Sequence, residues 1–142
     1  MTQNEKELLL KDLSARVPYD VKIRVEYPFL KEEEWHPEIL CWSDLLRLCV
    51  ANTSIILEEF KPYLFPMSSM TDEQKSYLYY NTKFDVDRYG DLITKFDEDD
   101  NYLYTDLYDY LSIIDWLNKN HFDYRGLIEK GLAIDCTDLD IY

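Results

Sequence analysis

The side chains best suited to nucleophilic or metal chemistry are few and scattered along the sequence. They are three cysteines, Cys41, Cys49 and Cys136, and two histidines, His36 and His121. A catalytic thiol requires a base and an orienting group, and a zinc site requires cysteines or histidines at short, regular spacing. These five residues show no such spacing, and Cys41 and Cys49 are surrounded by apolar residues, where a thiol usually packs as a small hydrophobe. The sequence therefore predicts no catalytic and no metal-binding residue of these types.

The acidic run at 97–101 places carboxylates at alternating positions, as the first half of a calcium loop does. Such a loop continues with Gly at its sixth position and Glu at its twelfth, where this chain has Tyr102 and Tyr108. The three glycines are too far apart to form a phosphate-binding loop. We therefore expect an exposed acidic loop and no bound cofactor.

The composition is that of a folded, strongly acidic protein. The 142 residues include 29 acidic and 15 basic ones, for a net charge of -14, and 46% of them are hydrophobic. This charge repels phosphate backbones and anionic lipids, so we expect no direct nucleic-acid binding and no membrane binding. The odd number of cysteines and the lack of a signal-like N-terminus predict a cytoplasmic protein. The length predicts a single domain over residues 1–142.

The N-terminal half predicts a helix followed by strands. Thr2 and Glu5 fit a capping box that begins a helix. Residues 21–27 then alternate between apolar and polar side chains, which is typical of a half-buried strand. Residues 39–42, 45–51 and 54–58 are interpreted as short antiparallel strands, although a helix over 43–49 also fits the apolar pattern.

The C-terminal half predicts mainly helices. Residues 61–66 contain two prolines and are expected to lead the chain out of the sheet. Thr71 and Gln74 fit a second capping box, for a helix that ends near Asn81. Thr105 and Asp106 are expected to begin a third helix, with an apolar face made of Leu107, Tyr110, Leu111, Ile114 and Leu117.

A last helix is predicted close to the C-terminus. Asp123 has the position of its N-cap, and Phe122 and Leu127 have the spacing of a hydrophobic staple. Gly131 is expected to end this helix in a left-handed conformation. The sequence as a whole predicts an α+β fold with an N-terminal helix, a small antiparallel sheet of three to four strands, barrel-like in one alternative, and C-terminal helices.

Three blocks of the sequence stand out, and they are Lys6–Leu13 with Arg16, Lys61–Thr71 and His121–Ala133. Together they resemble the corresponding blocks of a group of small acidic proteins from gut Bacteroidales and their phages. The group has no assigned activity and no known binding residues, so the resemblance implies a shared scaffold and a bacterial or phage-related origin, but no reaction.

The abundance of tyrosine is the feature that most favours a function. A domain of this size cannot bury all of its 13 tyrosines, and exposed tyrosine is enriched in protein–protein interfaces. We therefore expect a non-enzymatic protein that acts through protein–protein interaction, with an acidic, aromatic contact surface in the region 77–110. The candidate residues are Tyr77, Tyr80, Asp97, Asp99, Asp100, Tyr102 and Tyr104.

Three other hypotheses remain open on the sequence alone. An acidic decoy of phage origin would carry carboxylates spaced like the phosphates of a nucleic acid. A small-ligand binder or enzyme would use dispersed carboxylates and tyrosines. A homo-oligomer would use Trp35, Trp42 and the neighbouring apolar residues as a symmetric interface.

Overall fold

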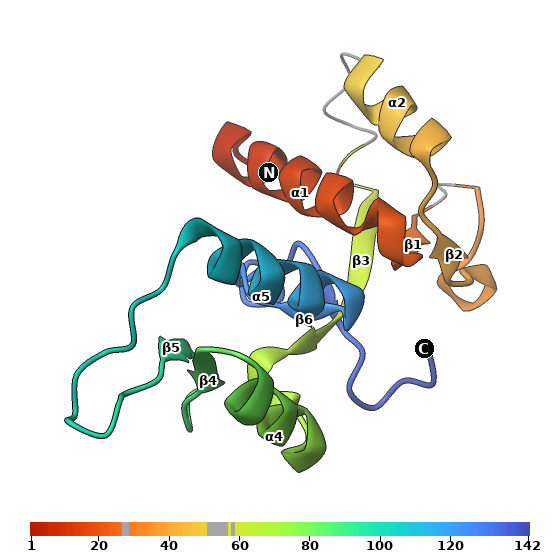
Figure 1. The fold of residues 1–142 in the computed structure, drawn as a ribbon. Coiled ribbons are helices and arrows are strands. Elements are labelled where there is room, and N and C mark those ends of the chain that lie inside the picture. Colours follow the sequence, from red (N-terminus) through yellow and green to blue (C-terminus); the bar gives the residue numbers. More distant parts are fainter. Residues whose placement is uncertain (27–28, 51–56, 58) are drawn as a thin grey trace. The chain divides into compact units, whose positions relative to one another are not determined.

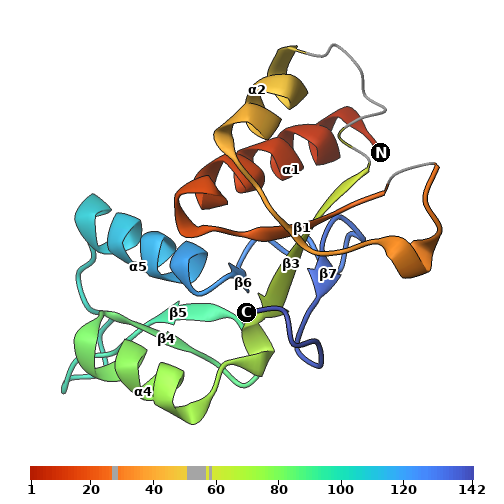
Figure 2. The same cartoon turned by 90° about the vertical axis from the view of Figure 1, so that its right-hand side faces the viewer.

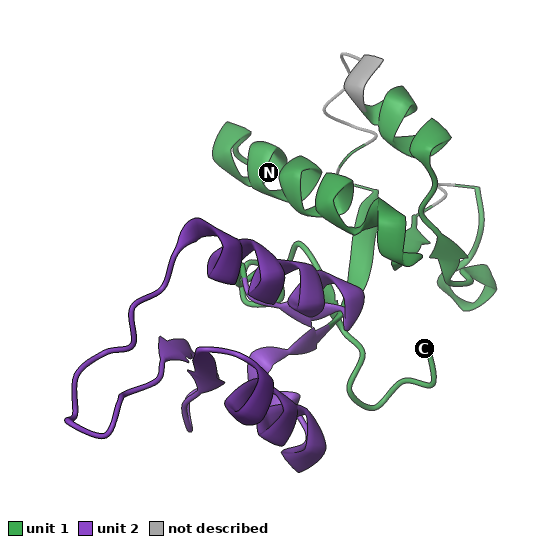
Figure 3. Cartoon of the chain, in the orientation of Figure 1, with its two compact units in different colours: residues 1–64, 125–142 green, residues 65–124 purple. Residues whose placement is uncertain are grey.

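The chain forms two compact units in the computed structural model, which describes residues 1–26, 29–50, 57 and 59–142 (Figures 1 and 3). Unit 1 contains Met1–Leu64 and Arg125–Tyr142, and unit 2 contains Phe65–Tyr124. Each unit has a hydrophobic core made from its own residues. The expectation of a single folding domain over residues 1–142 stays a prediction.

The chain has an α+β fold, as the sequence predicts. Unit 1 begins with helix α1 (Gln3–Arg16), and unit 2 contains helix α5 (Leu107–Lys119), with small sheets between them in the sequence (Figure 2). Short 3₁₀ helices cover Val17–Tyr19, Glu32–Glu34 and Met67–Ser69.

Helix α1 begins as its sequence predicts. The Thr2 hydroxyl accepts a hydrogen bond from the Glu5 N–H, and the Glu5 carboxylate accepts one from the Thr2 N–H at 2.6 Å. Leu9 and Leu13 are fully buried in the core of unit 1. The predicted capping box is therefore confirmed.

The sheet of unit 1 is mixed rather than wholly antiparallel. Strand β1 (Lys22–Val25) pairs antiparallel with β2 (Glu38–Ile39) and with β3 (Phe60–Pro66). Strand β7 (Ile134–Asp135) pairs with β3 in parallel. The strand order is β2-β1-β3-β6, where β6 is Phe122–Asp123, and β7 pairs with β3 off this path. This order is open, so the described strands do not form a barrel.

The alternating segment after α1 is a half-buried strand, as predicted. Val21, Ile23 and Val25 are buried, and the residues between them are partly exposed. Tyr27, which was expected on the same face, lies outside the described residues, as does most of the predicted strand at 54–58. Of the strand expected at 39–42, only Ile39 lies in a strand, the two-residue β2, and Trp42 already belongs to a helix.

The expectation that residues 61–66 leave the sheet is wrong, because they form most of β3. The Glu26 N–H donates to the Glu59 carbonyl, so the alternation of antiparallel pairs puts Pro62 opposite Ile23 without a hydrogen bond between them. The missing N–H of Pro62 therefore breaks no bond to β1.

The strand expected at 45–51 is also wrong, because Trp42–Val50 forms helix α2. The Asp44 carboxylate accepts a hydrogen bond from the Cys41 N–H at 3.0 Å and so caps the first turn. Leu45 is buried and Leu48 packs against the same core, a spacing of three residues that suits a helix. The alternative of a helix over 43–49 is the correct one.

The segment after residue 122 contains no helix where one was predicted. Asp123 lies in the two-residue strand β6 (Phe122–Asp123) and is not an N-cap, and residues 127–131 form a single turn. The Leu132 N–H donates to the Leu127 carbonyl and the Gly131 N–H to the Ile128 carbonyl, both at 2.9 Å. These are the two bonds of a Schellman motif. Gly131 has φ 69, so its predicted left-handed conformation is confirmed.

Unit 2 contains a helix, a hairpin and α5. Helix α4 (Asp72–Asn81) begins with the predicted box of Thr71 and Gln74. Strands β4 (Phe84–Val86) and β5 (Leu92–Thr94) form an antiparallel hairpin. Strand β6 pairs in parallel with Phe65 and Pro66 at the end of β3.

The predicted apolar face of α5 is largely wrong. Asp106 caps the helix as expected, with the Asp109 N–H donating to its carboxylate at 2.9 Å. Of the five residues expected in the core, only Leu117 is buried, and Leu107, Tyr110 and Leu111 are exposed. Ile113 is buried in their place, because the packed face is rotated relative to the most apolar face.

A buried ion pair lies within unit 1. The Arg16 Nε donates to the Asp12 carboxylate at 2.7 Å, one helical turn away, and both side chains are fully buried. The Arg125 Nε lies 3.8 Å from the other oxygen of Asp12. Asp12 thus links α1 to the segment that follows β6.

We expect Gly131→Val to lower the free energy of unfolding by about 1 kcal/mol or more, because a β-branched residue resists a left-handed backbone. An added Cβ would meet no atom within 4 Å, so the backbone alone sets the cost. Gly131→Asn is the matched control and should cost less, because Asn tolerates this conformation. Urea denaturation measures both variants, and equal stability of Gly131→Val and the unmodified protein would contradict the prediction.

We expect Asp12→Ala to lower the free energy of unfolding by about 3 kcal/mol or more, because it leaves the buried Arg16 without its carboxylate. The control is Glu26→Ala, which removes the partly exposed pair of Glu26 and Arg24 and should cost less than about 1 kcal/mol. The same denaturation experiment compares them. Similar losses of unfolding free energy in the two variants would contradict the prediction that the buried pair contributes more to stability than the partly exposed one.

Candidate functional site

The exposed aromatic side chains are concentrated in unit 2, every residue of which is described. Tyr80 and Tyr104 are both 81% exposed, and Tyr108 is 77% exposed. A tyrosine at the rim of a core buries its ring and exposes only its hydroxyl, so these fractions mean that whole ring faces meet the solvent. The exposed tyrosines of the unit are Tyr77, Tyr79, Tyr80, Tyr89, Tyr102, Tyr104, Tyr108 and Tyr110.

Some of these rings are held in place by other aromatic rings. Tyr77 stacks on Trp116 with the ring centres 5.5 Å apart, and Trp116 stacks on the buried Phe122 at 5.8 Å. Tyr79 and Tyr80, neighbours on α4, meet edge to face at 5.2 Å. Part of the surface is therefore anchored to the core of the unit, which lowers the entropy lost when such rings bind a partner.

The acidic run forms a tight turn that is held by its first residue. The Asp97 carboxylate accepts hydrogen bonds from the N–H groups of Asp99 and Asn101, both at 2.9 Å. The Asp97 N–H donates to the Asn101 carbonyl at 2.8 Å, and Asp100 has φ 59. The turn joins Phe96 to Tyr102, whose rings lie 4.6 Å apart.

The turn between β4 and β5 has the same geometry ten positions earlier. The Asp87 carboxylate accepts from the N–H groups of Tyr89 at 2.8 Å and Asp91 at 2.9 Å, and Gly90 takes the left-handed position. The Asp87 N–H donates to the Asp91 carbonyl at 2.9 Å. Strand β5 therefore lies between two acidic turns of the same construction.

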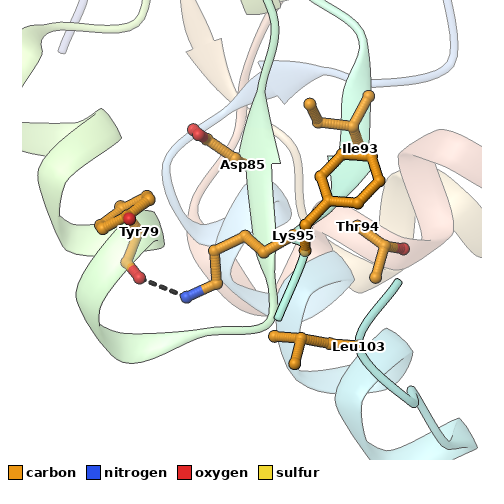
Figure 4. Close-up of a pocket in the computed structure, with 7 residues that line it drawn as sticks. Tyr79, Asp85, Ile93, Thr94, Lys95 and Leu103 are labelled. Atoms are coloured by element: carbon orange, nitrogen blue, oxygen red, sulfur yellow. Dashed lines mark hydrogen bonds between the residues drawn. The ribbon is translucent and has the colours of Figure 1, made fainter. Parts of the chain in front are cut away.

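An open hollow of about 330 Å³ lies on the outer face of the β4–β5 hairpin (Figure 4). Ile93 and Leu103 supply apolar walls, and Tyr79 borders it from α4. The Lys95 ammonium group donates to the Tyr79 carbonyl and lies 5.0 Å from the centre of the Tyr79 ring. Asp85 and Phe96 complete the border together with Thr94.

Two further cations of unit 2, outside the lining of this hollow, bind neighbouring groups. The Lys83 ammonium group lies 2.8 Å from the Asp109 carboxylate; this hydrogen bond raises the pKa of Lys83 and lowers the pKa of Asp109. The Arg88 guanidinium packs on the Tyr89 ring at 4.7 Å. With 13 acidic and 5 basic residues, unit 2 presents a negative surface.

All seven residues predicted as a partner surface lie in unit 2 and are exposed. The structure brings Asp97, Asp99, Asp100 and Tyr102 together in one turn, with Tyr104 following it. Tyr77 belongs instead to the stack on Trp116. Whether they form a binding site stays a prediction.

Sequence reasoning missed the apolar part of this surface. Leu107 is 74% exposed and Leu111 57%, although the periodicity of α5 placed both in the core. Ile93 and Phe96 are also exposed. The residues Leu92, Ile93 and Thr94 have side chains that favour strands and were the available signal for a strand next to the acidic run, but three residues are too few to distinguish a strand from a loop.

The two cysteines whose side chains the structure describes have different surroundings. The exposed Cys41 thiol lies 2.9 Å from the Asp44 carboxylate and donates to it. Cys136 is buried, and this burial raises the pKa of its thiol to about 11. No cluster of three His, Cys, Asp or Glu residues suited to a metal ion occurs among the described residues. The Cys49 side chain lies outside them.

No protein-family model, curated protein sequence or solved structure matches the chain. The resemblance to the proteins of gut Bacteroidales and their phages stays a prediction. Among the described residues, no helix has the length and apolarity needed to cross a bilayer.

We expect iodoacetamide at pH 8 to label Cys41 in the native protein and to leave Cys136 unlabelled. Cys136 is fully buried and, with a pKa of about 11, holds almost no thiolate at this pH. Peptide mass spectrometry measures labelling at each site. The control is the urea-unfolded protein, in which both sites should react; labelling of native Cys136 as fast as Cys41 would contradict the prediction.

Proposed function

We propose that this protein acts by binding another protein through the exposed aromatic and acidic surface of unit 2. The observation that carries the proposal is the set of eight exposed tyrosines in residues 65–124. Exposed apolar rings in contact with water are costly unless a partner covers them, and interface cores are enriched in tyrosine.

The charge of unit 2 indicates the chemistry of the partner. An acidic surface attracts a basic one, speeds their encounter and excludes acidic competitors. The partner is therefore a protein with a basic binding surface, and the complex weakens as the salt concentration rises.

The cellular setting is part of the same proposal. The free thiols of Cys41 and Cys136 fit a reducing compartment, which supports a cytoplasmic location. A bacterial or phage-related origin rests on the sequence resemblance alone.

The alternative functions have less support from the geometry. The carboxylates of Asp87 and Asp97 each accept two hydrogen bonds from their own turn. Such bonds fix the position of each carboxylate within its turn, which suits a structural role better than acid–base catalysis. The decoy hypothesis shares the acidic surface, but it does not account for the exposed tyrosines.

We expect the triple variant Tyr80→Ser, Tyr102→Ser, Tyr104→Ser to lose its partner. Capture from a bacterial lysate, quantified by mass spectrometry, should show a protein that the unmodified chain retains and that this variant retains at least about tenfold less, since aromatic residues supply much of the energy of an interface. The loss should occur without a change in melting temperature.

The matched control is Phe29→Ser, Ile39→Ser, Trp42→Ser, which removes exposed apolar side chains of unit 1. It should retain the same protein as the unmodified chain. Equal retention by both triple variants would contradict the assignment of the contact surface to unit 2.

A further inference from the structure

Strand β5 has one hydrogen-bonded edge and one free edge. The Lys95 N–H donates to the Lys83 carbonyl and the Asp87 N–H to the Asp91 carbonyl, both at 2.9 Å. In an antiparallel pair, hydrogen-bonded and non-hydrogen-bonded residue pairs alternate. Ile93 is therefore in a hydrogen-bonded pair with Asp85, and the N–H and C=O groups of Leu92 and Thr94 point away from β4. Within residues 65–124, no group is paired with the outward N–H and C=O groups of Leu92 and Thr94.

The outer edge of β4 is closed by contrast. The Phe84 N–H donates to the Thr82 hydroxyl at 3.0 Å, and the Val86 N–H donates to the Asp85 carboxylate at 2.8 Å. These side chains occupy the donors that another strand would need. Only the β5 side of the hairpin therefore offers main-chain groups for pairing, a feature that soluble proteins usually cover.

The returning chain does not cover this edge. Leu103 donates its N–H to the Lys95 carbonyl at 2.9 Å, which continues the pairing of Phe96 with Tyr102. Residues 91, 93, 95 and 97 turn their main-chain groups to the same edge of the chain, so Leu103 follows β4 along the hydrogen-bonded edge of β5 and leaves the outward groups of Leu92 and Thr94 unpaired. The position beside β5 is left to another segment.

The surroundings of the edge favour a basic, extended segment. The acidic turns at 87–91 and 97–101 lie at its two ends. A residue placed opposite Ile93 would share the outer face of the sheet with it, next to the hollow lined by Ile93 and Leu103.

We propose that the outer edge of β5 binds an extended, basic segment of a partner protein by β-strand addition, with an apolar side chain of that segment in the hollow. This inference rests on the proposed function and specifies how the partner is bound. Main-chain pairing supplies affinity, and the hollow and the acidic turns supply selectivity. A second copy of this chain fits poorly, because its own acidic turns would face those of the first.

The test is a titration of the isotope-labelled, full-length protein with the peptide acetyl-Lys-Val-Lys-Val-Lys-Val-amide. We expect the Leu92 and Thr94 amide resonances to shift and their hydrogen exchange to slow. The same peptide with alternate residues N-methylated keeps its charge but cannot pair as a strand, so its binding should be at least about tenfold weaker. A Glu-Val peptide of equal length should not bind.

Two variants test the edge from the protein side. Thr94→Pro removes an outward N–H and should weaken peptide binding at least about tenfold. Thr94→Val is the matched control, because it keeps the N–H and favours a strand, and it should bind as the unmodified protein does. If Thr94→Pro fails to fold, the comparison of the two peptides on the unmodified chain still decides the question.

The proposal is overturned if the basic peptide does not bind, if the N-methylated peptide binds equally well, or if the Leu92 and Thr94 amides are unaffected. Any of these results combined with loss of a partner by the tyrosine triple variant would overturn strand addition alone. Retention of all partners by that triple variant would instead overturn the assignment of protein contact to this surface.

Discussion

Strand β3 is the constraint on which most of the remaining structure depends. Its first part pairs with β1, Tyr63 and Leu64 pair with β7, and Phe65 and Pro66 pair with β6. These partners lie about 40 positions before β3 and about 60 to 70 positions after it in the sequence, so the strand joins segments from both ends of the chain. Leu64 is fully buried in the core of unit 1 and Phe65 packs against the core of unit 2. Pairing segments so far apart in the sequence costs loop-closure entropy. Packing of the two hydrophobic cores offsets this cost.

The features that the sequence predicts correctly are those decided by close neighbours. A capping box needs only a hydroxyl and a carboxylate or amide three residues apart, and the boxes of Thr2 and Thr71 formed as expected. Gly131 took its left-handed conformation although a single turn stands in place of the predicted helix, because the Schellman bonds span only residues 127–132. Local sequence patterns therefore predicted where helices and turns begin or end better than they predicted whether a segment is a helix or a strand.

Two of the incorrect predictions depend on partners that are distant in sequence. The two prolines of β3 suggested an exit from the sheet, and only the register with β1 shows why Pro62 is tolerated there. The most apolar face of α5 was expected in the core, yet the face with Ile113 and Leu117 is packed against it. The number of tyrosines and the run of acidic residues correctly predicted the exposed tyrosines and the exposed acidic turn, because charged residues and surplus tyrosines lie at the protein surface. It could not reveal that Leu107 and Leu111 are exposed as well, or that β5 has a free edge.

The free edge of β5 and the acidic turns on either side of it are physically related. A hairpin whose turns are each closed by their own first aspartate needs no outside group to hold its shape, so its edge is preformed before any partner arrives. Preformed edges bind with little loss of conformational entropy but also invite self-association. The carboxylates of the two turns at the ends of β5 oppose that self-association by like-charge repulsion. The same carboxylates would attract a basic segment. In the proposed complex the same charges would select a basic segment and disfavour pairing of this edge with a second copy, which relates the open edge of Leu92–Thr94 to the acidic turns beside it.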